Sequence, residues 1–236
     1  MSFPSTHWSL LAIASLSGNA DAQAALARLC ERYRSPVIVF LKQYGYSDDV
    51  VEDVAHEFFL ELLKSRAWKR AERVKGRFRT FLLGTLKHVA GRMKDRDSAE
   101  MRGGGEITAS LDEMAENGFE PPSANTEDCR EFDRAWALQL MDTTLAGIAR
   151  PYLEAGRDIE WQVISQFLPG AGTPPTYEEA AAQAGLTLTA FRAAVHRVRE
   201  LFRTNLRAAV ACTVSAAHEI DDELAYLHRV LTSPGA

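Results

Sequence analysis

The stretch from Thr176 to Arg197 reads TYEEAAAQAGLTLTAFRAAVHR and contains two helical patterns on either side of a glycine. Thr176, followed by Glu179 three residues later, has the pattern of a capping box and predicts the start of the first helix. Gly185 can take the positive φ that a sharp turn between two helices requires. The stretch therefore predicts a helix-turn-helix.

The second helix of this motif has one apolar side and one basic side. Phe191, Val195 and Val198 recur at helical spacing and are expected to bury against the first helix. The outward positions, together with two threonines that are candidate caps, are Thr187, Thr189, Arg192, His196, Arg197, Arg199 and Arg203. A recognition helix in the major groove of DNA needs this division between core and donors. A plain helical hairpin with a solvated basic face also fits, but the turn chemistry and the arginines favour DNA binding.

Helical periodicity continues along most of the chain and predicts an all-α fold, because no alternating strand pattern persists. Pro36 interrupts the early part, and Gly103–Gly105 and Pro121–Pro122 mark a longer break. Apart from a short stretch near the beginning, helices are expected at residues 21–33, 37–44, 51–62, 78–96, 127–149, 158–168, 177–184, 188–211 and 219–231.

These breaks predict two helical domains joined by a flexible acidic linker. The expected segments are an extension at 1–19, a first domain at 20–96, the linker at 97–126, a second domain at 127–211 and an acidic helix at 212–236. The terminal helix has two interpretations. It either masks a basic surface, or it packs permanently on the second domain.

The net charge of −5 conceals a strong asymmetry along the chain. From Lys64 to Arg102 there are thirteen Lys and Arg against four Asp and Glu, a balance of +9. From Gly103 to Trp136 there are nine acids against two arginines, a balance of −7. Basic surface attracts the phosphate backbone of nucleic acids by releasing counterions, and the acidic segment beside it can mask that surface or bind another partner.

Two further stretches, taken with the helix-turn-helix, resemble a known family. Residues 51–62 read VEDVAHEFFLEL, similar to the region 2.2 helix of bacterial RNA polymerase sigma factors, and residues 78–90 read FRTFLLGTLKHVA, similar to regions 2.3 and 2.4. The helix-turn-helix lies where region 4 is expected. The order and spacing resemble sigma factors of the extracytoplasmic-function (ECF) kind over residues 20–96 and 127–211, and residues 3–10 resemble the opening of a divergent subgroup with extended termini.

The resemblance implies that the first domain, a region 2-like bundle, docks on the clamp helices of the polymerase β′ subunit. The residues that would supply polar contacts are Glu52, Asp53, His56, Glu57 and Glu61. His56 stands where the family usually has glutamine, and its contribution would change on protonation. The resemblance also implies the β flap as a polymerase partner, with an anti-sigma factor or other regulator as a further candidate.

The same resemblance places the melted −10 promoter element on the first domain and the −35 element on the helix-turn-helix. Single strands are held by cationic grooves with aromatic side chains. The candidates for the −10 element are Trp68, Lys69, Arg73, Lys75, Arg77, Arg79, Lys87, His88 and Arg92. Phe78 and Phe81 are expected in the core. Phe81 and His88 replace the tryptophan and asparagine of the family, so the inherited base preference does not carry over directly.

Other features point to a non-enzymatic, cytoplasmic protein. Cys30, Cys129 and Cys212 have neither disulfide-framework nor zinc-site spacing. The chain has no catalytic signature, secretion signal or membrane span, so no cofactor, metal or membrane partner is expected. Asp53 and His56 form only a lone, imperfect version of the pair that a di-metal bundle needs. The leading alternative is a helix-turn-helix transcription regulator whose N-terminal helical domain senses a ligand or binds a partner.

Overall fold

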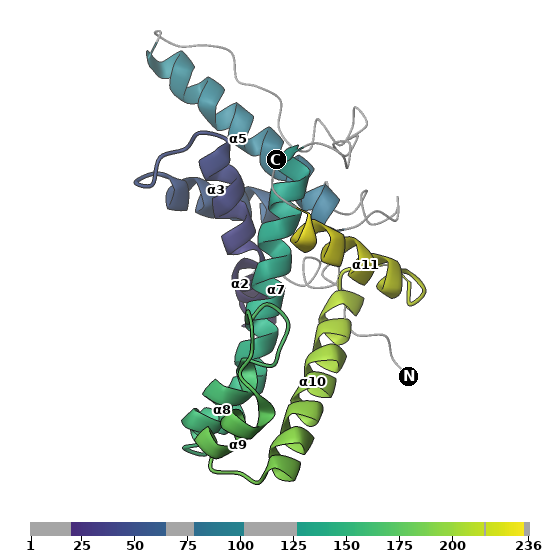
Figure 1. Cartoon of the computed structure of the whole chain (residues 1–236). Coiled ribbons are helices and arrows are strands. Elements are labelled where there is room, and N and C mark those ends of the chain that lie inside the picture. Colours follow the sequence, from purple (N-terminus) through teal and green to yellow (C-terminus); the bar gives the residue numbers. More distant parts are fainter. Residues whose placement is uncertain (1–19, 65–77, 102–126, 215, 234–236) are drawn as a thin grey trace. The chain divides into compact units, whose positions relative to one another are not determined.

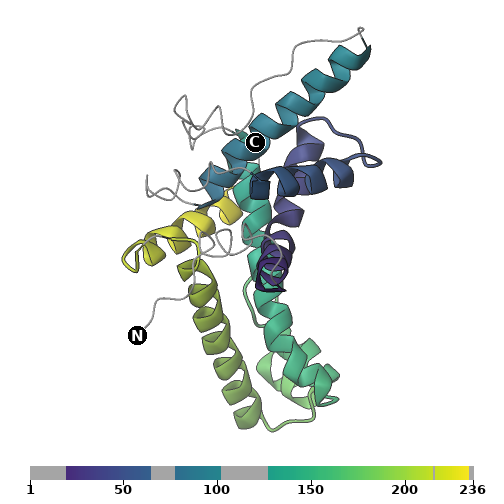
Figure 2. The same cartoon turned by 180° about the vertical axis from the view of Figure 1, so that it is seen from behind.

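The structure is a computed structural model, and it describes residues 20–64, 78–101, 127–214 and 216–233 (Figure 1). These residues are mostly helical and include no strand, so the all-α prediction is confirmed. The helices can be followed by colour from both sides (Figure 1 and Figure 2). They are α2 (Ala20–Gln43), α3 (Val51–Lys64), α5 (Phe78–Met101), α7 (Glu127–Glu154), α8 (Asp158–Ser165), α9 (Tyr177–Gln183), α10 (Leu188–Ala211) and α11 (Glu219–Thr232).

The chain divides into two compact units that do not follow one another in sequence. The first unit comprises residues 1–139 together with 210–236, and the second comprises residues 140–209. The two divisions fall inside α7 and α10. In chain order, the second unit is thus an insertion between two parts of the first.

In the first unit, α3 packs against both α2 and α5. Val54, Phe58 and Leu62 form the apolar stripe of α3, and all three are buried, as their spacing predicts. Phe78 and Phe81 of α5 are buried as well, which confirms that they belong to the core. The unit therefore has its own apolar core, around which the charged residues discussed below are placed.

Two prolines lie inside helices where the sequence predicts breaks. Helix α2 passes through Pro36, and α7 passes through Pro151 to end at Glu154. A proline inside a helix removes one backbone hydrogen bond. In α2, Val37 and Phe40 directly beyond the proline are almost fully buried, and this packing keeps the helix continuous. Pro151 lies near the end of α7, where the loss affects only the final turns.

The second unit buries a compact apolar core formed by the last part of α7 with α8, α9 and α10. Phe167, Ala180 and Phe191 belong to this core. The rings of Phe167 and Phe191 meet edge to face, with centroids 5.4 Å apart. Packing in this unit fixes how α9 and α10 are held, and these are the two helices of the predicted helix-turn-helix.

Candidate nucleic-acid interface

The turn between α9 and α10 has the local structure that the sequence predicts. The Thr176 hydroxyl accepts a hydrogen bond from the Glu179 backbone N–H at 3.3 Å, and the Glu179 carboxylate accepts one from the Thr176 N–H at 3.1 Å. The capping box is therefore confirmed. These hydrogen bonds, first that from the Thr176 side chain, lower the pKa of Glu179 below its ordinary range.

Gly185 closes α9 and turns the chain toward α10. Its φ is +67°, in the region that favours glycine. The Leu186 N–H donates to the Ala181 carbonyl at 2.9 Å, and the Gly185 N–H donates to the Ala182 carbonyl at 3.2 Å. This pair of bonds is a Schellman motif, which satisfies carbonyls at a helix end. The turn is thus fixed by its own backbone bonds.

The capping residue of α10 is Thr187 rather than Thr189. The Thr187 hydroxyl accepts a hydrogen bond from the Ala190 N–H at 3.2 Å, while Thr189 is exposed in the first turn. Phe191, Val195 and Val198 are almost fully buried, as predicted. The two sides of α10 are therefore separated into core and solvent.

Three exposed basic residues lie close together in the first half of α10, and we call them the α10 basic face: Arg192, His196 and Arg197. Arg192 lies 3.5 Å from Glu178, and its guanidinium carbon is 5.7 Å from the ring centroid of Tyr177. Within the described part of the chain, His196 and Arg197 make no ion pair. The side chains of this face can therefore supply hydrogen-bond donors to a ligand.

The structure corrects the role of Arg199 and qualifies that of Arg203. Arg199 is half-buried, and its Nε and Nη2 both donate to the Phe167 carbonyl, at 3.0 and 2.8 Å. These bonds hold the chain after α8, so Arg199 is a structural residue rather than an outward DNA contact. Arg203 is exposed and pairs with Glu200 one turn earlier on the same helix.

On α3, most of the predicted polymerase contacts already have partners inside the first unit. Glu52 pairs with Arg34 of α2, and Glu61 pairs with Arg92 of α5. Glu57 lies 3.4 Å from Arg96, also on α5. Arg92, a predicted DNA contact, and Glu61, a predicted polymerase contact, thus neutralise one another. Asp53 and His56 are exposed, and neither makes an ion pair with another described residue.

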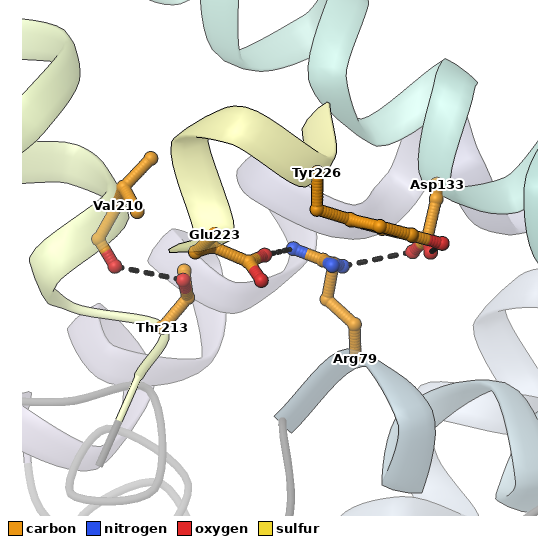
Figure 3. A network of polar contacts seen from close by, with 6 residues as sticks. All are labelled: Arg79, Asp133, Val210, Thr213, Glu223 and Tyr226. Carbon is orange, nitrogen blue, oxygen red and sulfur yellow. Dashed lines mark hydrogen bonds and ion pairs between the residues drawn. The ribbon is translucent and has the colours of Figure 1, made fainter. Parts of the chain in front are cut away.

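Arg79, another predicted DNA contact, is buried and belongs to the core of the first unit (Figure 3). Its Nε donates to Asp133 of α7 at 2.8 Å, and its Nη1 donates to Glu223 of α11. Its guanidinium carbon lies 4.2 Å from the ring centroid of Trp136. Tyr226 donates from its hydroxyl to the second oxygen of Asp133 at 2.5 Å. We call these five residues the Arg79 cluster.

The charges in the Arg79 cluster stabilise one another, with Arg79 and Glu223 buried and Asp133 partly exposed. Burial by itself lowers the pKa of Arg79, but the carboxylates of Asp133 and Glu223 outweigh it and raise that pKa. The guanidinium therefore stays charged, and it donates hydrogen bonds to Asp133 and Glu223. Since only 3% of Arg79 is exposed, the structure overturns its assignment to promoter DNA.

The remaining predicted −10 contacts are only partly described. Lys87 and His88 are half-buried on α5. Trp68, Lys69, Arg73, Lys75 and Arg77 lie outside the described residues. The described residues thus include no complete site for a single strand.

Sequence reasoning missed Asp133 and Glu223, and with them the position of α11. One side of α11 holds the buried residues Ile220 and Leu227, and Glu223 is buried between them. An acid inside an apolar stripe is a signal that it meets a buried cation. Helix α11 contacts Arg79 of the predicted first domain and also Asp133 and Arg134 of α7, which lies within the predicted second domain of residues 127–211. All of these residues belong to the first structural unit.

Comparisons of the chain with protein-family models, curated proteins and solved structures gave no match. Among the residues described, no helix is both long and apolar enough to cross a membrane. The same residues include no group of three His, Cys, Asp or Glu side chains placed to hold a metal ion.

Proposed function

We propose that this protein is a sigma factor of the ECF kind, which directs bacterial RNA polymerase to promoters in the cytoplasm and carries out no chemistry itself. The observation that carries the proposal is the capped helix-turn-helix, in which the α10 basic face points away from a buried core. A helix of this kind fits the major groove, where arginine reads guanine through two hydrogen bonds. The second unit would therefore read the −35 element.

The first unit supports the part of the proposal that concerns polymerase. Its helix α3 has the sequence pattern of the docking helix and exposes Asp53 and His56. These side chains can meet cationic and hydrogen-bonding groups on the β′ clamp helices. Docking would bring the basic part of the chain to the melted −10 strand, and binding of the opened strand would offset the cost of melting. An anti-sigma factor would act by covering either surface.

Co-purification with core polymerase, followed by run-off transcription, tests the function. Asp53→Lys is expected to abolish co-purification while the circular dichroism spectrum stays native, because exposed substitutions change stability by about 0.5 kcal/mol at most. Asp142→Lys makes the same charge change at an exposed position of α7 in the second unit, and it should bind polymerase normally.

Two results would count against this function. If Asp53→Lys still co-purifies with core polymerase like the unaltered protein, α3 is not the docking helix. Duplex DNA binding without any association with core polymerase would identify the protein as a helix-turn-helix regulator of the ordinary kind.

A further inference from the structure

The first unit is completed by a segment that follows the helix-turn-helix in the chain. The chain leaves the first unit after Gln139 and re-enters it at Val210. The re-entering residues are buried at once: Val210, Thr213 and Val214 are each less than a tenth exposed. The Thr213 hydroxyl donates to the Val210 carbonyl at 2.7 Å (Figure 3). The return of the chain is thus part of the core of that unit.

Helix α11 is then fastened to α5 and α7 at three places along its length. Glu223 pairs with Arg79 of α5, and Tyr226 donates to Asp133 of α7 (Figure 3). At the end of α11, Arg134 of α7 donates to the carbonyls of Val230 and Leu231, both at 3.3 Å. A cation is favourable at this helix end because the last carbonyls carry partial negative charge.

We propose that residues 210–214 and 216–233 are a closing strap for the first unit, and that Glu223 is the positioning residue through which the strap sets α5 and, through α5, the docking helix α3. The link from α11 to α3 is physical: Glu223 holds Arg79 at the start of α5, and α5 packs on α3. Loss of the Glu223 carboxylate would leave the buried Arg79 guanidinium with Asp133 as its remaining carboxylate partner. In this proposal the strap supports polymerase docking.

This proposal also gives the order in which the units can form during synthesis. The second unit ends at residue 209, and all its residues have been made before the strap exists. The first unit cannot close until Glu223 and Tyr226 have been made. A chain that is cut or stopped after α10 would keep a DNA-reading unit and lose the unit that docks on polymerase.

Hydrogen exchange of the full chain tests the strap without reference to any partner. Glu223→Ala is compared with Asp222→Ala, which removes a carboxylate from the neighbouring, exposed position of the same helix. In Glu223→Ala, the amides of α3 and α5 should exchange roughly a hundred-fold faster or more, as expected when a buried ion pair loses one partner. Helices α9 and α10 up to residue 209 should keep their protection. Asp222→Ala should leave both units unchanged.

Two outcomes would overturn the strap. In one, Glu223→Ala speeds exchange only within α11, which would make that helix an appendage. In the other, exchange in α9 and α10 rises as much as exchange in α3 and α5. Should Glu223→Ala not fold at all, Tyr226→Phe keeps the test available, because it removes the hydroxyl that donates to Asp133, keeps the ring, and should loosen α5 and α3 to a smaller extent.

The role of the strap in docking rests on the proposed function, and a second measurement separates the two. If the unaltered protein co-purifies with core polymerase, Glu223→Ala should reduce that association at least ten-fold and leave the affinity for duplex DNA within two-fold. Association that is unaffected would overturn the role in docking and leave the sigma assignment intact. If the unaltered protein does not associate with polymerase, the function fails, and the exchange result still decides whether the strap exists.

Discussion

Helices α5 and α10 both carry arginines at helical spacing, yet the two helices use them in opposite ways. On α5, Arg79 pairs with Asp133 and Glu223, Arg92 pairs with Glu61, and Arg96 lies near Glu57. These acids come from α3, α7 and α11. The positive charge of α5 is thus largely neutralised within the first unit.

On α10 the exposed arginines meet fewer and weaker partners. Arg192 and Arg203 have acids only at exposed positions, and Arg197 pairs with no acid of the described chain. Exposed pairs are worth roughly 0–1 kcal/mol, and a phosphate or a base can replace them. The difference teaches that the density of arginine in a sequence does not identify a ligand-binding face. Whether a row of arginines forms such a face depends on which carboxylates the fold places opposite them.

The largest expected effect concerns α5, the helix whose arginines are paired with acids. Arg79→Met should lower the free energy of unfolding of the first unit by about 3–5 kcal/mol, because Glu223 would stay buried without a cation and the partly exposed Asp133 would lose its partner. Arg96→Met, at an exposed position of the same helix, should change it by about 0.5 kcal/mol at most. Urea denaturation, with the transition of each unit assigned by hydrogen exchange, measures both.

A second set of variants shows whether the charge pairs themselves matter. Adding Asp133→Asn and Glu223→Met to Arg79→Met should restore part of the loss, since an apolar replacement of a whole buried ion cluster is often tolerated. If Arg79→Met costs no more than Arg96→Met, then Arg79 is not the centre of a buried cluster, and the contrast between α5 and α10 fails.

Features that depend on a few neighbouring residues can be predicted from the sequence. The capping box of Thr176 and Glu179 and the turn at Gly185 are of this kind, as is the buried side of α10. Each follows from helix geometry and local hydrogen bonds, which need no knowledge of the rest of the fold.

The cluster around Arg79 depends on long-range contacts and could not be predicted in the same way. Its acidic partners lie 54 and 144 positions further along the chain. A basic residue between two apolar helical positions is compatible with a buried side chain and equally with an outward one until its partners are known. The position of Arg79 between the core residues Phe78 and Phe81 is the one local hint that it turns inward.

The next largest effect concerns α10, the helix whose arginines are exposed, and it is an effect on DNA affinity. Arg192→Ala and Arg197→Ala should each weaken binding to duplex −35 DNA by roughly 1–3 kcal/mol if they contact bases. If they contact only phosphate, affinity should fall evenly across sequences, and the dependence on salt should become shallower. Arg150→Ala, an exposed arginine of α7 in the same unit, is the matched control and should bind normally.

Fluorescence anisotropy with a cognate and a scrambled duplex at several salt concentrations distinguishes these cases. Full affinity and selectivity in both Arg192→Ala and Arg197→Ala would show that the α10 basic face is an ordinary solvated surface. In that event the arginines of α5 and α10 would differ in their exposure, but neither set would read DNA.

The smallest effect concerns the start of α9, the helix that precedes α10 in the helix-turn-helix. Thr176→Ala should destabilise the second unit by about 1 kcal/mol, because it removes the side chain that caps α9. Thr173→Ala, an exposed threonine of the preceding loop, is the control and should change little.

The effect of Thr176→Ala should also depend on pH. The pKa of Glu179 is lowered by its hydrogen bonds to Thr176, so the stabilisation from its carboxylate is full at neutral pH and is lost as the pH falls through that lowered pKa. Unfolding measured at neutral pH and in acid should therefore show a smaller gap in stability between Thr176→Ala and the unaltered protein in acid. Glu179→Gln should remove this pH dependence. A gap that is the same at both pH values would mean that the carboxylate of Glu179 contributes nothing to the cap, and that the Thr176 hydroxyl alone holds the start of α9.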